Sequence, residues 1–323
     1  MIQLQEITID KKELLDRYLK LQCIESSEFT FTNLFMWRKS YNIKYAIIND
    51  LLCFFPQHLG TGGPRSSTFP IGDTSSKENV RAALSEILRY FEEVNEPAMI
   101  RLCNEESVEL LHKLFPNQFT VTEDENMFDY VYSIPELISL SGKKFHQKRN
   151  HISKFKSLYE FEYRKITSDN LNDCVELFNR WYDSVTERNV DVSEGREAFD
   201  EFASNFEKLG ERCTQSLCYG TGLAGGGIYV DGKLVAFSFG EPLCNHVVVI
   251  HFEVADTEYQ GAFPIINQQF LENEWSGYDF VNREEDMGLE GLRRAKRSYN
   301  PVKMTKKYVA SFAEATGKDL DIY

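Results

Sequence analysis

The stretch from residue 222 to 273 constrains the fold of this chain most, because it sets an order of strands followed by a helix. Apolar runs at 222–230 and 234–240 flank Asp231-Gly232, a dipeptide that favours the tight turn of a β-hairpin. A third apolar run at 246–254 predicts another strand, and residues 262–273 predict a helix. A further strand is expected at 278–281, so this half of the chain has the pattern of a mixed α/β unit.

The first half of the chain has an alternation of its own. Two apolar runs separated by Asn49-Asp50 predict a hairpin, and the dense aromatic block at 29–37 is expected to be core or to line a cleft. Helices and strands should then alternate, with helices at 77–94 and 105–115 and strands at 98–102, 119–122 and 128–132. The pattern indicates an α+β fold.

Two domains are expected, because 323 residues that are 42% hydrophobic can bury two cores of about 100 to 170 residues each. The first would span residues 1–140. The second would span 141–323 and begin with a basic linker helix at 142–158, for which Ser141 is a suitable N-cap. Helices at 171–187 and 194–209 and a strand at 214–219 complete the expected second domain.

Composition excludes several classes of protein. No run of eighteen apolar residues and no signal-peptide pattern occurs, so a cytoplasmic protein without a transmembrane segment is expected. The seven cysteines are scattered and form no C-x-x-C pair, which argues against a disulfide framework. The six histidines show no metal-ligand spacing, so no metal is expected.

Basic charge is concentrated in two runs, although the formal net charge of the chain is −14. Residues 293–307 carry seven cations and no acid, and residues 143–156 carry six cations and no acid. Each run has two interpretations, a solvated helix face or a contact for a polyanion. Because Glu284, Glu285 and Asp286 stand just before the later run, acids and cations are expected to meet there.

Three segments resemble the soluble domain that ends phosphatidylglycerol lysyltransferases, and a related group of standalone proteins. They are residues 143–150 with Phe155, residues 230–237 and 250–256, and residues 291–296 with Tyr299, Pro301 and Tyr308. The resemblance implies α+β architecture with two tandem GNAT-like domains, as in Fem-type aminoacyltransferases. Family members of known activity move an aminoacyl group from charged tRNA to a lipid headgroup hydroxyl.

The resemblance therefore implies an acyltransferase that uses aminoacyl-tRNA as donor, with tRNA as a partner and a lipid headgroup, a peptide or a small molecule as acceptor. One alternative is an N-acyltransferase that uses acyl-CoA. However, residues 258–263 lack the glycine-rich loop that cradles the pyrophosphate of CoA, so acetyl-CoA is not expected as a cofactor and no other cofactor is indicated. A second alternative is a non-catalytic protein that binds an anionic ligand.

Transfer from an ester requires a positioned nucleophile, a route for its proton and positive charge near the developing oxyanion. The candidate catalytic residues are Glu253, Asp256, Glu285, Asp286 and Lys296. The candidate substrate-binding residues are Lys143, Lys144, Lys148, Arg149, His251, Arg293, Arg294, Arg297 and Tyr299. Each group has a structural alternative: the acids could cap helices, His251 could be a satisfied core residue, and Tyr299 could pack.

Overall fold

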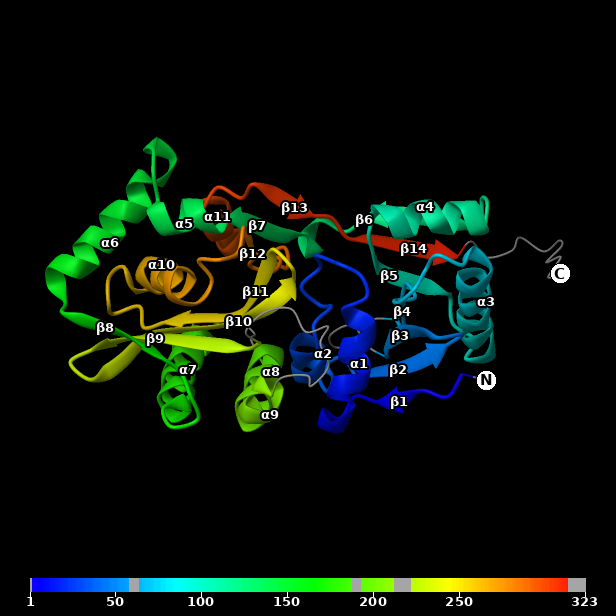
Figure 1. Ribbon diagram of the computed structural model, residues 1–323, viewed down its shortest axis with the longest axis horizontal. Helices are drawn as coiled ribbons and strands as arrows, with labels where there is room; N and C mark the ends of the chain where they lie inside the picture. Colours follow the sequence, from blue (N-terminus) through cyan, green and yellow to red (C-terminus); the bar gives the residue numbers. More distant parts are fainter. Residues whose placement is uncertain (1, 58–63, 188–192, 212–221, 313–323) are drawn as a thin grey trace. The chain divides into compact units, whose positions relative to one another are not determined.

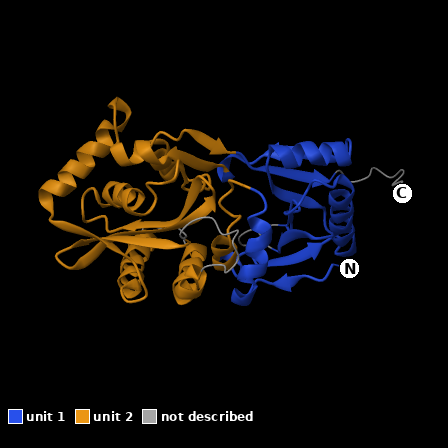
Figure 2. Ribbon diagram, viewed as in Figure 1, with its two compact units in different colours: residues 1–22, 37–127, 306–323 blue, residues 23–36, 128–305 orange. Residues whose placement is uncertain are grey.

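The computed structural model describes residues 2–57, 64–187, 193–211 and 222–312, and it has the expected α+β class with mixed sheets (Figure 1). The chain forms two compact units (Figure 2). Unit 1 comprises residues 1–22, 37–127 and 306–323, and unit 2 comprises residues 23–36 and 128–305. The expected strand at 214–219 lies outside the described residues.

Unit 1 contains two small sheets. The first is antiparallel, in the order β1 (Gln5–Glu6), β2 (Ile43–Ile48), β3 (Leu51–Pro56). The second has the order β4 (Ser67–Thr68), β5 (Met99–Cys103), β14 (Tyr308–Phe312), β6 (Phe119–Glu123). The predicted β2–β3 hairpin is confirmed, and Asn49 and Asp50 have φ of 51° and 59°, as a turn with two left-handed residues requires.

The helices of unit 1 are α1 (Lys12–Leu19), α3 (Lys77–Glu93) and α4 (Glu105–Leu114), with 3₁₀ turns at Ile9–Lys11 and Glu125–Met127. Helix α3 begins where the Ser76 hydroxyl accepts a hydrogen bond from the Asn79 amide. Three of its apolar side chains, Val80, Leu84 and Ile87, are fully buried in one core. The spacing of those residues predicted this helix correctly.

Unit 2 is built on a seven-stranded sheet. Its order is β13 (Lys303–Thr305), β7 (Asp129–Ser133), β12 (Phe280–Asn282), β11 (Val247–Ala255), β10 (Lys233–Cys244), β9 (Ala224–Val230), β8 (Phe161–Lys165). All neighbours are antiparallel except β11 and β12. Asp231 and Gly232, with φ of 51° and 79°, make the predicted turn between β9 and β10.

Helices cover both faces of this sheet in Figure 1, with α10 (Ala262–Glu274) on one face and α7 (Leu171–Thr186) and α8 (Ser193–Ser204) on the other. The α7–α8 face is held by stacked rings, with Phe178 and Phe199 only 3.9 Å apart. The remaining elements are α2 (Phe31–Trp37), α5 (Ile134–Ser139), η3 (Lys143–Phe145), α6 (His146–Leu158), α9 (Phe206–Gly210) and α11 (Glu290–Arg297).

The compact units do not coincide with consecutive halves divided at residue 140. The cause is strand pairing, because β14 near the end of the chain pairs with β5 and β6 of the first half. Strand β7, from the first half, pairs in turn with β12 and β13 of the second. The basic helix α6 belongs to unit 2.

Cys23 and Cys244 form a disulfide within unit 2, with Cα atoms 5.4 Å apart, which the scattered cysteine spacing did not predict. It ties the segment before α2 to the end of β10. Cys53, Cys103 and Cys174 are buried thiols. Across the described part of the chain, no helix combines the length and the apolar character needed to cross a membrane.

Candidate functional site

A cavity of about 550 Å³ lies in unit 2, at the edge of the sheet where β11 and β12 end. Residues of β11, the loop that leads into α10, the start of α10, the turn after β12, α11 and α6 line it. Because β11 and β12 are parallel, with Val249 opposite Asn282, the residues that follow β12 reach the same edge as the second half of β11. Ligands of mixed α/β sheets commonly bind at such carboxyl ends.

Arg283, the first residue after β12, is held by a buried ion pair. It donates to Glu253 of β11 over 2.6 Å, and the two side chains are 13% and 11% exposed. Asn267 of α10 donates to the other oxygen of Glu253 over 3.0 Å. Burial lowers the pKa of Arg283, but Glu253 outweighs it, so the net change is upward and the guanidinium stays charged.

Two lysines line the cavity near this pair. Lys148 of α6 places Nζ 3.5 Å from the ring centroid of Tyr299, and the Arg283 guanidinium lies 4.6 Å from the same centroid. Burial, with Arg283 adding to it, lowers the pKa of Lys148 to about 8. Lys296 of α11 donates from Nζ to the carbonyl oxygen of Arg283. Burial lowers the pKa of Lys296 as well, against the opposing effect of Glu284.

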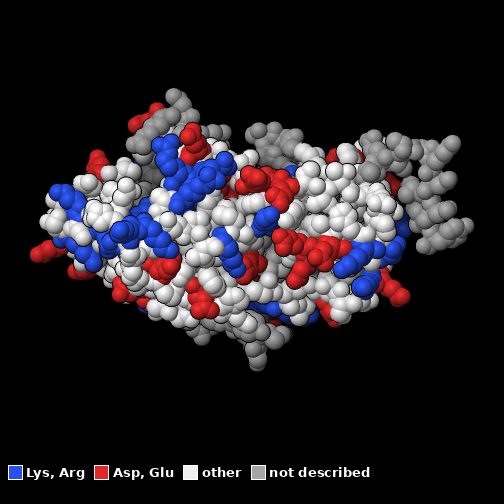
Figure 3. All heavy atoms as spheres, turned by 90° about the horizontal axis from the view of Figure 1, so that it is seen from above, with Lys and Arg blue, Asp and Glu red and all other residues white. Residues whose placement is uncertain are grey.

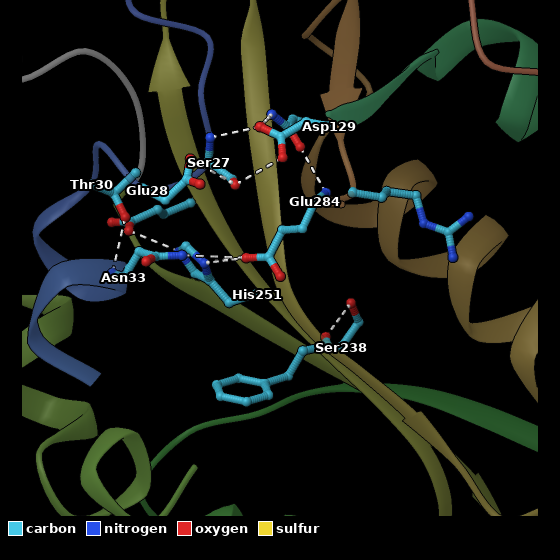
Figure 4. Close-up of polar contacts among 12 residues, drawn as sticks. Ser27, Glu28, Thr30, Asn33, Asp129, Ser238, His251 and Glu284 are labelled. Atoms are coloured by element: carbon cyan, nitrogen blue, oxygen red, sulfur yellow. Dashed lines mark hydrogen bonds and ion pairs between the residues drawn. The ribbon is translucent and has the colours of Figure 1, made fainter. Parts of the chain in front are cut away.

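His251 and Glu284 both line the cavity, and Figure 4 shows their side chains pointing toward each other. The His251 ring is fully buried, with Nε2 3.0 Å from Glu241 and Nδ1 3.4 Å from Glu284. Burial lowers the pKa of His251, but hydrogen bonds to these two carboxylates outweigh it and raise the pKa to about 9. Since Asn33 also donates to Glu284 over 3.4 Å, the carboxylate is held from two sides.

A buried polar network fixes the backbone that carries Glu284. Its amide donates to Asn282 over 2.7 Å, and Asn282 donates in turn to Asp129 over 2.8 Å. The amide of Ser27 donates to the same Asp129 oxygen over 2.8 Å (Figure 4). Glu284 has φ of 58°, which a non-glycine residue keeps only when its surroundings enforce it. The turn after β12 is therefore preorganised.

Asp286 supports the start of α11 and does not line the cavity. It is 1% exposed and accepts hydrogen bonds from Tyr130 over 2.6 Å, from the Gly288 amide over 2.9 Å and from Arg293 over 2.8 Å. The hydrogen bond from Arg293 is the largest cause that lowers the pKa of Asp286, to about 2. This geometry fits a structural role for Asp286 and Arg293.

Comparison with known proteins identifies the family. The sequence profile of the phosphatidylglycerol lysyltransferase C-terminal family matches residues 22–311. The chain belongs to this family. A crystal structure of a conserved protein of unknown function from Bacteroides thetaiotaomicron is 32% identical, with a TM-score of 0.85 over 97% of this chain and 100% of that one.

More distant solved structures share the fold. The structure of L-PGS from Bacillus licheniformis is 15% identical, with a TM-score of 0.61 over 98% of this chain and 94% of that one. FemX is 10% identical, with a TM-score of 0.58 over 96% of this chain and 97% of that one. The implied resemblance and fold are thus confirmed. An uncharacterised protein of Mycoplasmoides gallisepticum is 24% identical over 187 residues, which span 57% of this chain and only 56% of that protein.

The structure brings some of the sequence-predicted residues together and leaves others apart. Lys148, His251, Glu253, Asp256, Lys296 and Tyr299 line the cavity. Asp256 also lies 3.4 Å from Lys233 and accepts a hydrogen bond from the amide of Glu258, as a turn-capping acid would. Glu285 is half-buried and lies outside the cavity lining.

The remaining predicted cations lie outside the cavity. Lys143, Lys144, Arg294 and Arg297 are exposed, and Figure 3 shows Lys and Arg gathered over the part of unit 2 that carries α6 and α11. Arg149 donates to the carbonyls of Leu140 and Gly142, which places it in the start of α6. The later basic run is divided between the two units, since Lys306 belongs to unit 1 and pairs there with Glu123.

Sequence reasoning missed Arg283 and Glu284 as site residues. Both belong to the charged stretch after an expected strand at 278–281, but Glu284 was expected only to meet the later cations and Arg283 was given no role. The available signal was their position directly after that strand, where side chains emerge at a sheet edge. The parallel partner of the strand, which brings Glu253 and His251 to the same edge, could not be inferred from the spacing of the residues.

Proposed function

We propose that this protein is an aminoacyltransferase that takes its acyl group from aminoacyl-tRNA. Family membership supports the reaction class. The observation that carries the proposal is the pairing of opposite charges in one cavity, with Glu284 and Lys296 both in its lining and attracting each other. An aminoacyl ester has a cationic α-amine beside a carbonyl that becomes anionic in the transition state, so it needs both kinds of group.

In this proposal the acceptor nucleophile forms a bond to the ester carbonyl carbon while the bond to the 3′ oxygen of tRNA breaks. The proton of the nucleophile passes to the departing 3′ oxygen, so no further reactant is needed. Glu284, held by His251 and Asn33, would bind the α-ammonium. Lys296 would place positive charge beside the developing oxyanion, where a preorganised donor is worth about 3 kcal/mol.

The exposed cations around the cavity would contact the RNA. Lys143 and Lys144 lie at the start of α6, and Arg294 and Arg297 lie on α11. Since the whole chain carries a net charge of −14, binding of a polyanion depends on such local groups. Arg294 is 78% exposed and its contact to Glu290 is 3.7 Å, so it is free to turn toward a phosphate.

The start of α10 favours aminoacyl-tRNA over the alternative donor, acyl-CoA. A pyrophosphate at a helix N-terminus is held by free backbone N–H groups. Here the Ala262 amide already donates to Tyr259, and Pro264 has no N–H. The first three residues of α10 therefore leave at most the Phe263 amide for such a ligand. This supports a donor that is not anchored by a pyrophosphate.

Measuring tRNA binding over a series of salt concentrations distinguishes the contribution of the exposed cations from that of the cavity residues. We expect wild-type protein to bind charged tRNA with a logarithmic affinity that falls linearly with the logarithm of salt concentration. The Arg294→Ala/Arg297→Ala variant should bind more weakly with a shallower slope, whereas Lys296→Met should keep most of the slope. Salt-insensitive binding, or equal slopes in wild type and the double variant, would contradict the proposed RNA contact.

A further inference from the structure

We propose that the disulfide between Cys23 and Cys244 is a reversible redox switch that controls how firmly Glu284 is held in the cavity. Both cysteines belong to unit 2, where Cys244 ends β10 and Cys23 begins the segment 23–36, named here the strap. The switch concerns regulation of the site and so goes beyond the proposed function. It rests on that function only where turnover is measured.

The first end of the strap supports the backbone of Glu284. The Glu25 carbonyl oxygen accepts a hydrogen bond from Asn282 over 2.8 Å, and the Glu284 amide donates to Asn282 over 2.7 Å. The Glu25 carboxylate also pairs with Lys303. Because Glu25 follows Cys23 after a single intervening residue, the disulfide restrains the carbonyl that orients Asn282. Glu284 keeps its φ of 58° only while such contacts enforce it.

The rest of the strap supports the carboxylate of Glu284. Asn33 donates to that carboxylate over 3.4 Å. Between Asn33 and the disulfide, Ser27 donates to Asp129 from its backbone amide over 2.8 Å and from its hydroxyl over 3.1 Å (Figure 4). The strap therefore holds both the backbone and the side chain of Glu284. Opening the disulfide at Cys23 releases one end of the segment that makes all these contacts.

The disulfide is open to exchange with small thiols, whereas the other thiols in the described ranges are protected. Cys23 is exposed and Cys244 is only 8% exposed, so an incoming thiolate is directed to Sγ of Cys23 and Cys244 is the leaving group. Exposed disulfides are the ones that exchange readily. Cys53, Cys103 and Cys174 are buried, and burial raises the pKa of each thiol, so little thiolate forms there.

The redox step balances with a small thiol and its disulfide, for which glutathione is the probe. One glutathione thiolate attacks Cys23, which forms a mixed disulfide and releases Cys244 as a thiolate. A second glutathione thiolate attacks the glutathione sulfur of the mixed disulfide, and Cys23 leaves as a thiolate. Two glutathione molecules thus give two electrons and two protons to the protein and become one oxidised glutathione. Oxidised glutathione reverses the sequence.

The first test measures hydrogen exchange of the full chain after equilibration with reduced or with oxidised glutathione. The reporters are the backbone amides of Ser27 and Glu284, since each donates one of the hydrogen bonds that the strap supports. In the reduced protein we expect both amides to exchange about tenfold faster. The amide of Ile265, which donates within α10, is the reference and should change much less. Equal acceleration of all three amides would indicate a general loss of stability.

Variants assign the response to the disulfide. Cys23→Ser/Cys244→Ser should behave like reduced wild type in both glutathione solutions. Cys213→Ser/Cys218→Ser removes the two cysteines that lie outside the described residues, and this matched control should keep the full response. Mass spectrometry of proteolytic peptides should find Cys23 linked to Cys244 in the oxidised protein. The oxidised wild type should consume an aminoacyl ester about tenfold faster than the reduced wild type.

Four outcomes would overturn the proposal: no link between Cys23 and Cys244 in folded oxidised protein, exchange at Ser27 and Glu284 that is the same in both states or is accelerated no more than at Ile265, a response that persists in Cys23→Ser/Cys244→Ser, or equal turnover of the two states. A result of a different kind concerns the proposed function. If neither state consumes an ester but the exchange difference is present, the switch stands and the proposed function is rejected.

Discussion

The Glu253 carboxylate lies 2.6 Å from the Arg283 guanidinium, and this pair joins β11 to the turn after β12. Both side chains are nearly buried, so each partner neutralises a charge that would otherwise be costly in this environment. The pair also fixes the guanidinium against Tyr132 and Tyr299, whose ring centroids lie 5.5 Å and 4.6 Å from it. The ion pair and the two tyrosine rings therefore fix the position of the Arg283 charge in the cavity wall.

Removing one charge of this pair should destabilise the protein. Glu253→Gln leaves the Arg283 charge buried without compensation, and we expect the free energy of unfolding to fall by about 3 kcal/mol. In the Glu253→Gln/Arg283→Met variant part of that loss should be recovered. Urea denaturation of four proteins, the wild type, Glu253→Gln, Arg283→Met and the double variant, measures this double-mutant cycle. Additive losses in the double variant would show that the two charges do not stabilise each other.

Stability should also decrease at alkaline pH because of His251. Its pKa is raised from 6.5 to about 9, so its contribution is complete below pH 6.5 and is lost as the pH rises through 9. The loss amounts to at most about 3 kcal/mol. Between pH 6.5 and 9 the wild type should lose stability relative to His251→Gln. Parallel pH profiles of the two proteins would be inconsistent with a charged His251 between Glu241 and Glu284.

The same substitution at two glycines should have opposite effects. Gly261 has φ of 94°, and a Cβ there would lie 2.5 Å from the carbonyl oxygen of His151, so Gly261→Ala should be destabilising and disturb the cavity rim. Gly291 lies in α11, and a Cβ there meets nothing within 4 Å. Gly291→Ala should be neutral or stabilise by about 0.5–1 kcal/mol. Thermal unfolding distinguishes the two; a loss of stability in both would refute the argument.

Substitutions at Asp286 and Lys296 should have different effects, the first on stability and the second on turnover. Asp286→Asn weakens the buried contacts to Arg293 and Tyr130, so the urea midpoint should fall while residual folded protein keeps its turnover. Lys296→Met should leave the urea midpoint almost unchanged and reduce turnover about a hundredfold. Denaturation and ester consumption are measured on both variants. The reverse pattern would assign the catalytic role to Asp286.

Local signals in the sequence predicted most of the elements of the fold. Both hairpins were predicted from their turn dipeptides, Asn49-Asp50 and Asp231-Gly232. These residues have positive φ, and a tight turn is determined by the few residues that form it. The division into units could not be predicted in the same way. The division depends on the pairing of β14 with β5 and β6. The hydrophobic pattern of a strand does not indicate which distant strand it pairs with.

Six of the residues predicted from residue type, local charge and the family resemblance line the cavity, and their roles stay predictions: Lys148, His251, Glu253, Asp256, Lys296 and Tyr299. Residue type and local charge did not separate the structural ion pair of Asp286 and Arg293 from the cavity groups, because both kinds of residue lie in one charged stretch. Burial of Asp286 distinguishes it from the cavity residues, and its buried contacts with Tyr130 and Gly288 exist only in the folded structure.

The central claim is tested most directly by incubating the protein with a total pool of aminoacyl-tRNA and with lipid, peptide and small-molecule acceptors. The loss of the ester above its spontaneous hydrolysis is then followed. The account predicts that wild-type protein consumes the ester of at least one amino acid and that Lys296→Met does so about a hundredfold more slowly. Ester loss at the spontaneous rate with folded wild-type protein, across all amino acids and acceptors offered, would contradict it.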